Sequence, residues 1–241
     1  LISPEDQSAD FVELFFDLVF VFAITRITHL TAHHIDLPHI LRSLLVFWLI
    51  WWGWTQFTWT LNTANTKHPQ IRLGTLTATG IAFAMAVSTD QAFGDGVMWF
   101  ALPYVAVRAL GLWMQFRVTA PEDGSRTVLY VWAGLSIVGL VAVLGGAFSN
   151  PLARVWWWLA AIGLDFIAGL FGGNKEGWNI RAKHFSERHS LIVIIALGES
   201  LIVAAGAVST GERTIGLAVA GGLAVLVTCL LWWSYFAWIR E

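Results

Sequence analysis

The chain has 241 residues, 57% of them hydrophobic and 12% charged, with a mean hydropathy of +0.67 and a formal net charge of −2. Soluble domains carry about 25% charged residues, so this chain has too little charge to cover a water-facing surface. The slightly negative net charge also argues against a nucleic-acid partner, because the phosphate backbone is bound by basic proteins.

Eight segments are long and apolar enough to cross a membrane as helices, a crossing that takes about 20 residues. They lie at roughly 11–31, 38–60, 71–92, 96–117, 127–148, 152–173, 189–208 and 214–238. Short loops rich in Pro, Gly, Asn and Asp separate them. Strands of a membrane β-barrel would alternate apolar and polar residues, and these runs do not. We therefore predict an all-α fold, a polytopic transmembrane helical bundle. Residues 1–241 would form a single transmembrane domain, either complete or part of a longer bundle.

Lys and Arg are distributed unevenly between the two sides of the predicted bundle. The side that holds both termini receives nine, which are Lys67, Arg72, Arg117, Arg126, Lys175, Arg181, Lys183, Arg188 and Arg240. The other side receives four, which are Arg26, Arg42, Arg154 and Arg213. Cytoplasmic loops of membrane proteins are enriched in Lys and Arg, so we expect both termini in the cytoplasm. The chain would then be a multi-pass protein of a cell membrane, and we expect the bacterial inner membrane.

The first predicted span contains two carboxylates, Glu13 and Asp17. They lie four residues apart and therefore share one face of the helix. Two ionised carboxylates at this spacing repel each other, so they must share a proton, bind a cation or face a basic partner. The pair is either an ion-pairing site that holds helices together or a proton or cation site.

Arg108 lies near the middle of the fourth predicted span, where an unpaired guanidinium is costly. We therefore expect it to pair with Asp17, Asp165 or Glu199. Such a pair either sets the register of the helices or belongs to a substrate or proton site.

The seventh predicted span carries Glu199 about ten residues from its start, or about 15 Å at the helical rise, near the bilayer middle. Gly198 beside it allows a helix or a ligand to approach closely. Arg188 and His189 lie at the cytoplasmic mouth of this span. His184 and His189 are five residues apart and no Cys accompanies them, so we predict neither a metal site nor a cofactor.

Five motifs carry a family resemblance. They are Glu13-Leu-Phe-Phe-Asp17-Leu-Val-Phe-Val-Phe-Ala, Tyr104 to Arg108, His184-Phe-Ser-Glu187-Arg188-His189, Ile195-Ala-Leu-Gly198-Glu199-Ser200 and Trp232-Trp233-Ser-Tyr235-Phe236. In this order and spacing they resemble the bacterial low temperature requirement A (LtrA) family. Ser190 departs from the family pattern by replacing a usual Gly, and Ala237 stands where an acid is common. The resemblance implies a membrane location rather than a mechanism. It also implies further hydrophobic segments, because family members usually continue with them.

These observations favour a protein that moves a small ion or small solute, with proton or cation coupling. The expected transport or ligand site consists of Asp17, Arg108, Asp165 and Glu199. Glu13, Arg188 and His189 would form the cytoplasmic entrance. Two alternatives stay open: an intramembrane enzyme that acts on a lipophilic, isoprenoid-like substrate by acid catalysis, and a membrane sensor or structural component. The expected partners are the lipid bilayer and the transported species, and a homo-oligomer is left open.

Overall fold

The structure is a computed structural model that describes residues 8–32, 35–119, 125–173, 181–211 and 214–239. Helices form all of the regular elements in these residues, so the predicted all-α class is confirmed. The α-helices are α1 (Phe11–Ala32), α2 (Leu37–Thr63), α3 (Pro69–Val87), α4 (Val97–Val118), α5 (Ser125–Ala147), α6 (Pro151–Gly173), α7 (Ala182–Thr210) and α8 (Ile215–Ser234). A 3₁₀ turn, η1 (Thr89–Gln91), follows α3, and a short π-helix, η2 (Tyr235–Ile239), follows α8.

Six of the described helices, α3 to α8, are each long and apolar enough to cross a membrane. Helices α1 and α2 also have the required length, at 22 and 27 residues, and both carry polar and charged side chains. Several of these side chains are buried inside the bundle, among them Glu13, Asp17 and Gln56. The protein is therefore a multi-pass membrane protein, and α1 and α2 direct several of their polar groups toward protein rather than lipid.

The helix starts follow from capping residues in the connections. Asp36 accepts a hydrogen bond from the backbone N–H of His39 at 2.9 Å, and a proline stands in the first turn of α2. Asn150 caps α6 in the same way, because its side-chain oxygen accepts from Ala153 N at 2.9 Å. These side chains satisfy N–H groups that a helix start leaves free.

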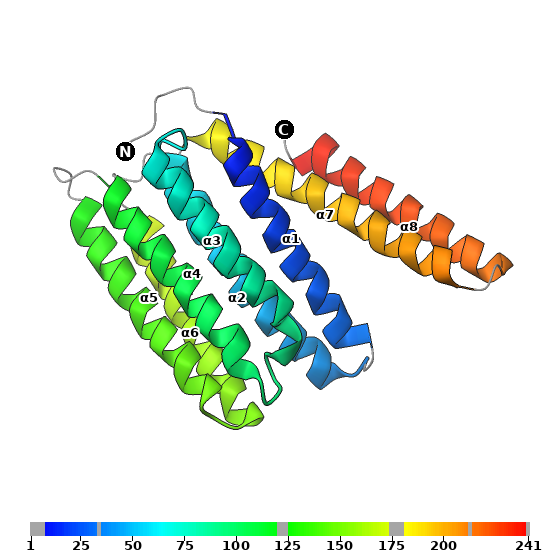
Figure 1. Ribbon diagram of the computed structural model, residues 1–241, viewed down its shortest axis with the longest axis horizontal. Coiled ribbons are helices and arrows are strands. Elements are labelled where there is room, and N and C mark those ends of the chain that lie inside the picture. Colours follow the sequence, from blue (N-terminus) through cyan, green and yellow to red (C-terminus); the bar gives the residue numbers. More distant parts are fainter. Residues whose placement is uncertain (1–7, 33–34, 120–124, 174–180, 212–213, 240–241) are drawn as a thin grey trace.

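The two central helices are α1 and α2. Helix α1 packs against α2, α3 and α7, while α2 also packs against α4, α6 and α7. Helices α5 and α6 form an extensively packed hairpin at the edge of the bundle that lies away from α7 and α8 (Figure 1). The start of α1 and the end of α8 lie at the same end of the molecule (Figure 1), as eight alternating crossings require.

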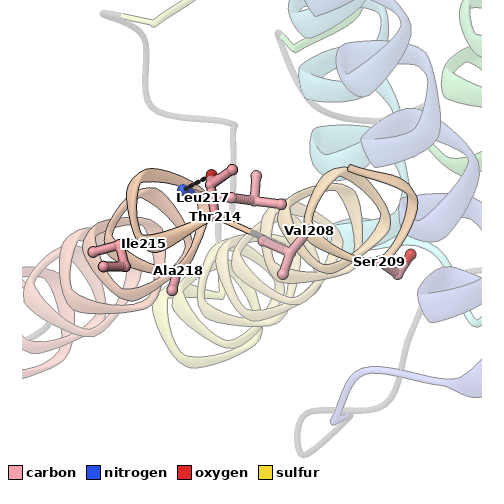
Figure 2. A pocket seen from close by; sticks show the side chains of 6 residues that line it. All are labelled: Val208, Ser209, Thr214, Ile215, Leu217 and Ala218. Carbon is pink, nitrogen blue, oxygen red and sulfur yellow. Dashed lines mark hydrogen bonds between the residues drawn. The ribbon is translucent and has the colours of Figure 1, made fainter. Parts of the chain in front are cut away.

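Helices α7 and α8 lean away from the other helices, and α8 follows the outer side of α7 (Figure 1). The buried residues of α7 are His184, Arg188, Ser190 and Ile192, all in its first half, and α8 has none. At the turn between them, Thr214 Oγ1 accepts from Leu217 N at 3.2 Å beside a hollow of about 640 Å³ whose described lining residues are uncharged (Figure 2). Helix α7 is thus held to the bundle by its first turns.

Helix α7 begins at Ala182, seven residues before the span predicted at 189–208. His184 and Arg188 therefore lie inside the helix rather than in a loop. The polar residues of 182–188 lower the hydropathy of this stretch, so a hydropathy scale does not detect the helix start. Two of them, His184 and Arg188, are buried, and α7 packs against α1 and α2.

Candidate functional site

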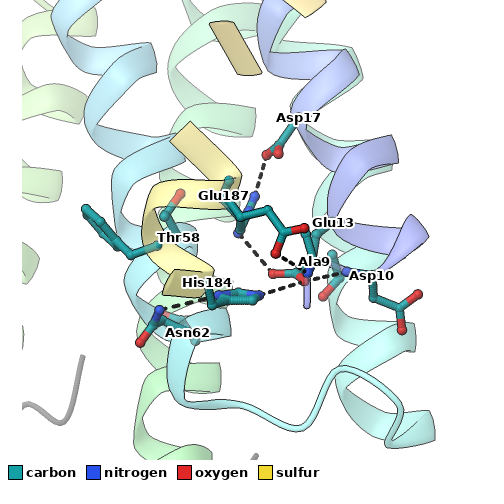
Figure 3. A network of polar contacts seen from close by, with 12 residues as sticks. Ala9, Asp10, Glu13, Asp17, Thr58, Asn62, His184 and Glu187 are labelled. Carbon is teal, nitrogen blue, oxygen red and sulfur yellow. Dashed lines mark hydrogen bonds and ion pairs between the residues drawn. The ribbon is translucent and has the colours of Figure 1, made fainter. Parts of the chain in front are cut away.

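The first turns of α1 and α7 meet at a buried group of charged side chains, which we call the α1–α7 charge cluster: Glu13, Asp17, His184 and Arg188. The Arg188 guanidinium donates to the Asp17 carboxylate through Nη2. Its Nη1 lies 3.4 Å from Glu13 Oε1. Figure 3 shows Glu13 and Asp17 extending from α1 toward α7, and both carboxylates contact this arginine of α7. Glu13, Asp17 and Arg188 have no exposed surface.

His184 links this cluster to α2. Its Nε2 lies 3.1 Å from Glu13 Oε2, and its Nδ1 lies 3.3 Å from Asn62 Nδ2 (Figure 3). The orientation of the Asn62 amide is set by Arg181, whose backbone N–H donates to Oδ1 at 2.7 Å and whose carbonyl accepts from Nδ2 at 3.1 Å. The Asn62 N–H that faces His184 therefore makes Nδ1 an acceptor and leaves the ring proton on Nε2. This hydrogen-bond pattern is that of a neutral imidazole whose Nε2–H donates to Glu13.

The α1–α7 charge cluster brings two carboxylates, Glu13 and Asp17, against the single guanidinium of Arg188. With both carboxylates ionised and His184 neutral, it carries one excess negative charge. Two carboxylate oxygens, Glu13 Oε1 and Asp17 Oδ2, are buried without a hydrogen-bond partner. The cluster can therefore take up one proton or one monovalent cation and become neutral.

Trp54 of α2 covers the cluster from the bundle side. Its indole N–H donates to Asp17 Oδ1 at 2.7 Å, and the Arg188 guanidinium carbon lies 5.8 Å from its ring centroid. His189 packs edge-on against the same ring at 4.9 Å and donates its Nδ1–H to the Phe185 carbonyl at 2.8 Å. His189 thus lies behind Trp54, and its partners are not the carboxylates of the cluster.

The segment before α1 covers the outer end of the cluster. The backbone N–H of Asp10 donates to Glu13 Oε2 at 2.9 Å, and the N–H of Ala9 donates to Glu187 Oε2 at 3.2 Å (Figure 3). Asp10 itself pairs with Arg72 at 3.0 Å. Asp10 and Arg72 neutralise each other, whereas the half-buried Glu187 adds a further carboxylate outside the cluster.

A second buried ionic group joins α4 and α6. Arg108 forms a two-point ion pair with Asp165, with Nη1 2.9 Å from Oδ2 and Nη2 2.8 Å from Oδ1. Arg108 Nη1 also donates to the Tyr104 hydroxyl at 3.0 Å, and the Ser136 hydroxyl donates to Asp165 Oδ1 at 3.4 Å. This group has no excess charge.

Aromatic side chains separate the two ionic groups. Phe16 packs against Phe20 and Phe57, with ring centroids 4.6 and 4.7 Å apart, and all three rings are fully buried. A Cβ atom at Gly53 would lie 3.6 Å from the Phe20 ring and 3.8 Å from Arg108 Cδ. Asp17 and Arg108 therefore belong to different groups, although both were predicted for one site.

The remaining predicted residue, Glu199, lies in neither ionic group. It is half-buried on α7 and lines an apolar groove between α1, α3 and α7. The predicted set thus occupies three places: Asp17 with Glu13 and Arg188, Arg108 with Asp165, and Glu199 alone.

Sequence reasoning missed the roles of His184, Asn62 and Trp54. A usable signal was present for His184, because it lies four residues before Arg188, the same spacing that separates Glu13 from Asp17. Two helices that each present a charged or titratable pair at this spacing can match face to face. Asn62 and Trp54 offered no comparable signal, because their positions relative to α7 depend on how α2 packs.

Comparison with known proteins gives one family and one curated relative. The family described as Bacterial low temperature requirement A protein (LtrA) matches residues 8–241. An uncharacterized protein of Rhizobium meliloti (strain 1021) is 30% identical over 245 aligned residues, which cover 97% of this chain and 59% of that protein. The chain therefore spans less than two thirds of the length of this relative. No solved structure matches the chain.

Proposed function

We propose that this chain, which belongs to the bacterial low temperature requirement A family, moves a small ion or solute across the membrane and couples that movement to a proton or cation. The coupling site is the α1–α7 charge cluster. The observation that supports the proposal is the charge balance of this cluster, in which two buried carboxylates face one guanidinium and a neutral His184.

Uptake of a proton or cation at the cluster acts on the contact between α1 and α7. The two carboxylates project from α1, while Arg188 and His184 belong to α7. A proton on Asp17 or Glu13 removes one of the attractions to Arg188, and its release restores that attraction. Since the buried residues of α7 all lie in its first half, the cluster is well placed to control how α7 sits against α1.

The Arg108–Asp165 pair has a different part in this proposal. It is neutral, both of its charges are satisfied, and it draws hydrogen bonds from neighbouring helices. Such a pair sets the register of helices rather than exchanging protons. We assign it to the scaffold against which α1 and α7 move.

Flux measurements on purified protein in proteoliposomes test the proposal. Ions and small solutes are screened with and without an imposed pH gradient, for the wild type and Asp17→Asn. This substitution leaves Glu13 as the one carboxylate facing Arg188, so the cluster becomes neutral without taking up a proton or cation, and the fold is expected to hold. We expect the wild type to show a flux driven by the gradient of pH or of the coupling cation, and Asp17→Asn to lose that coupling.

Asp90→Asn is the matched control, because Asp90 is exposed on η1. It should transport like the wild type. Absence of any coupled flux in the wild type, or full coupling in Asp17→Asn, would contradict the proposal.

A further inference from the structure

We infer that the groove between α1, α3 and α7 is a binding site for a lipophilic cation, with Glu199 as the counter-ion. A lipophilic cation here means an apolar molecule that carries one positive charge. This site is separate from the α1–α7 charge cluster, and its occupancy does not depend on the transport proposal.

The groove has the size and lining of a small-molecule site. Its volume is about 580 Å³, within the range of about 300–1,000 Å³ typical of ligand pockets. Two helices supply the apolar walls and one supplies the charge. The lining residues are Phe15, Leu18, Val19 and Phe22 of α1, Leu76, Thr79, Gly80 and Phe83 of α3, and Glu199 of α7.

Within the described ranges, the Glu199 carboxylate of this groove has no side-chain partner. Among the described residues, no side chain forms a hydrogen bond or ion pair with the Glu199 carboxylate. The two carboxylates of the neighbouring helix α1, Glu13 and Asp17, are engaged in the α1–α7 charge cluster. Arg26 lies on α1 one turn beyond Phe22, and no ion pair between Arg26 and Glu199 is found among the described residues. A carboxylate among apolar side chains within a membrane-spanning helix is costly, and a bound cation offsets that cost.

The aromatic rings of the groove suit the same ligand. Phe22 of α1 and Phe83 of α3 stack across the helix boundary with centroids 6.0 Å apart, and Phe15 and Phe83 are about half exposed. Ring faces attract cations, and this attraction strengthens away from water. An apolar cation would therefore be attracted both by the aromatic rings and by the Glu199 carboxylate.

Other ligand classes fit less well. An anion would meet the Glu199 carboxylate and no cation among the lining residues. A hydrated metal ion would find few oxygen ligands, because only Glu199 and Thr79 contribute side-chain oxygens, and Thr79 already donates its hydroxyl proton to the Thr75 carbonyl at 2.8 Å. A neutral lipid would leave the carboxylate unpaired.

Binding of tetraphenylphosphonium to the full chain in a neutral detergent tests the site, with tetraphenylborate as an anion of matched size and shape. We expect saturable binding of the phosphonium ion. Glu199→Gln should weaken it by about tenfold or more, because the counter-ion is lost. Tetraphenylborate should neither bind saturably nor compete.

Two further variants separate the groove from a general effect on the fold. A Cβ at Gly80 would meet nothing within 4 Å, so Gly80→Leu should fold normally, fill the groove and weaken phosphonium binding without removing a charge. Asp90→Asn should bind like the wild type. Thermal unfolding of each variant, measured beside binding, identifies any loss that comes from misfolding.

Wild-type affinity in both Glu199→Gln and Gly80→Leu would overturn the inference, as would equal binding of the anion. The outcome is independent of the coupling site, because Asp17→Asn is expected to bind the phosphonium ion normally even where it abolishes coupled flux.

Discussion

Arg108 and Asp165, which are 57 residues apart in the chain, form a two-point ion pair among four helices. Arg108 Nη1 lies 2.9 Å from Asp165 Oδ2, and Nη2 lies 2.8 Å from Oδ1. Arg108 belongs to α4 and Asp165 to α6, and both helices pack against α2 and α5. The other two helices also contribute, since Ser136 of α5 donates to Asp165 and Gln56 of α2 donates to the Arg108 carbonyl at 3.1 Å. One ionic group thereby orients four helices.

The first prediction concerns the stability that depends on this pair. Arg108→Leu leaves Asp165 buried without its partner, a loss that typically costs about 3–5 kcal/mol. We expect the variant to be poorly folded, or to unfold at a much lower temperature in detergent. Arg117→Leu is the control, because Arg117 is exposed and stacks on Trp113, and it should change stability by no more than about 1 kcal/mol.

A double variant checks the cause. Arg108→Met combined with Asp165→Leu removes both charges and leaves apolar side chains, a replacement that is often neutral. It should recover much of the stability lost in Arg108→Leu. A single variant as stable as the wild type would show that the pair does not hold these helices.

The second prediction concerns the close approach of α2 and α4. A Cβ at Gly111 would lie 2.9 Å from both Gln56 Nε2 and Phe57 Cε2, which are buried. Gly111→Ala should therefore destabilise the protein by about 1–3 kcal/mol, as overpacking does. Gly134→Ala is the matched control, because a Cβ there meets nothing within 4 Å, and it should be neutral or stabilising. Equal unfolding temperatures for the two variants would contradict this packing.

The third prediction concerns the contacts of Asn62. In Asn62→Leu the amide that faces His184 Nδ1 is gone, and so are the two hydrogen bonds to the Arg181 backbone. Buried polar groups left without a partner cost about 1–3 kcal/mol. We therefore expect the variant to be less stable than the wild type.

The unfolding temperature in detergent measures this loss, and it should be lower in Asn62→Leu than in the wild type. Lys67→Leu, on the exposed surface beyond α2, should unfold like the wild type. Equal unfolding temperatures for Asn62→Leu and the wild type would contradict the role assigned to Asn62.

The fourth prediction concerns orientation. The bias of nine Lys and Arg residues to four predicts that a reporter fused after Glu241 lies in the cytoplasm. A reporter inserted at Asp95, in the connection between η1 and α4, should lie on the opposite side of the membrane. Periplasmic activity of the first fusion, or cytoplasmic activity of the second, would reverse the topology.

Hydropathy and charge were sufficient to predict the all-α class, the membrane location and the approximate position of each helix, because a membrane helix satisfies its own backbone and only needs an apolar run of the right length. The family resemblance was also readable, since motifs such as 13–17 and 184–189 keep their spacing along the chain. The start of α7 was placed too late, because burial by another helix is invisible to a hydropathy scale.

The partners of the buried charges were decided by the tertiary structure alone. Desolvation requires that Arg108 meet a carboxylate, and three carboxylates fitted that requirement equally well along the chain. Because α2, α4, α5 and α6 pack together, Arg108 pairs with Asp165. Because α7 packs against α1, Asp17 pairs with Arg188, and Glu199 faces an apolar groove. The sequence determined that buried charges need partners, whereas helix packing decided which partners they have, because that choice depends on distances between helices that hydrophobic patterning does not encode.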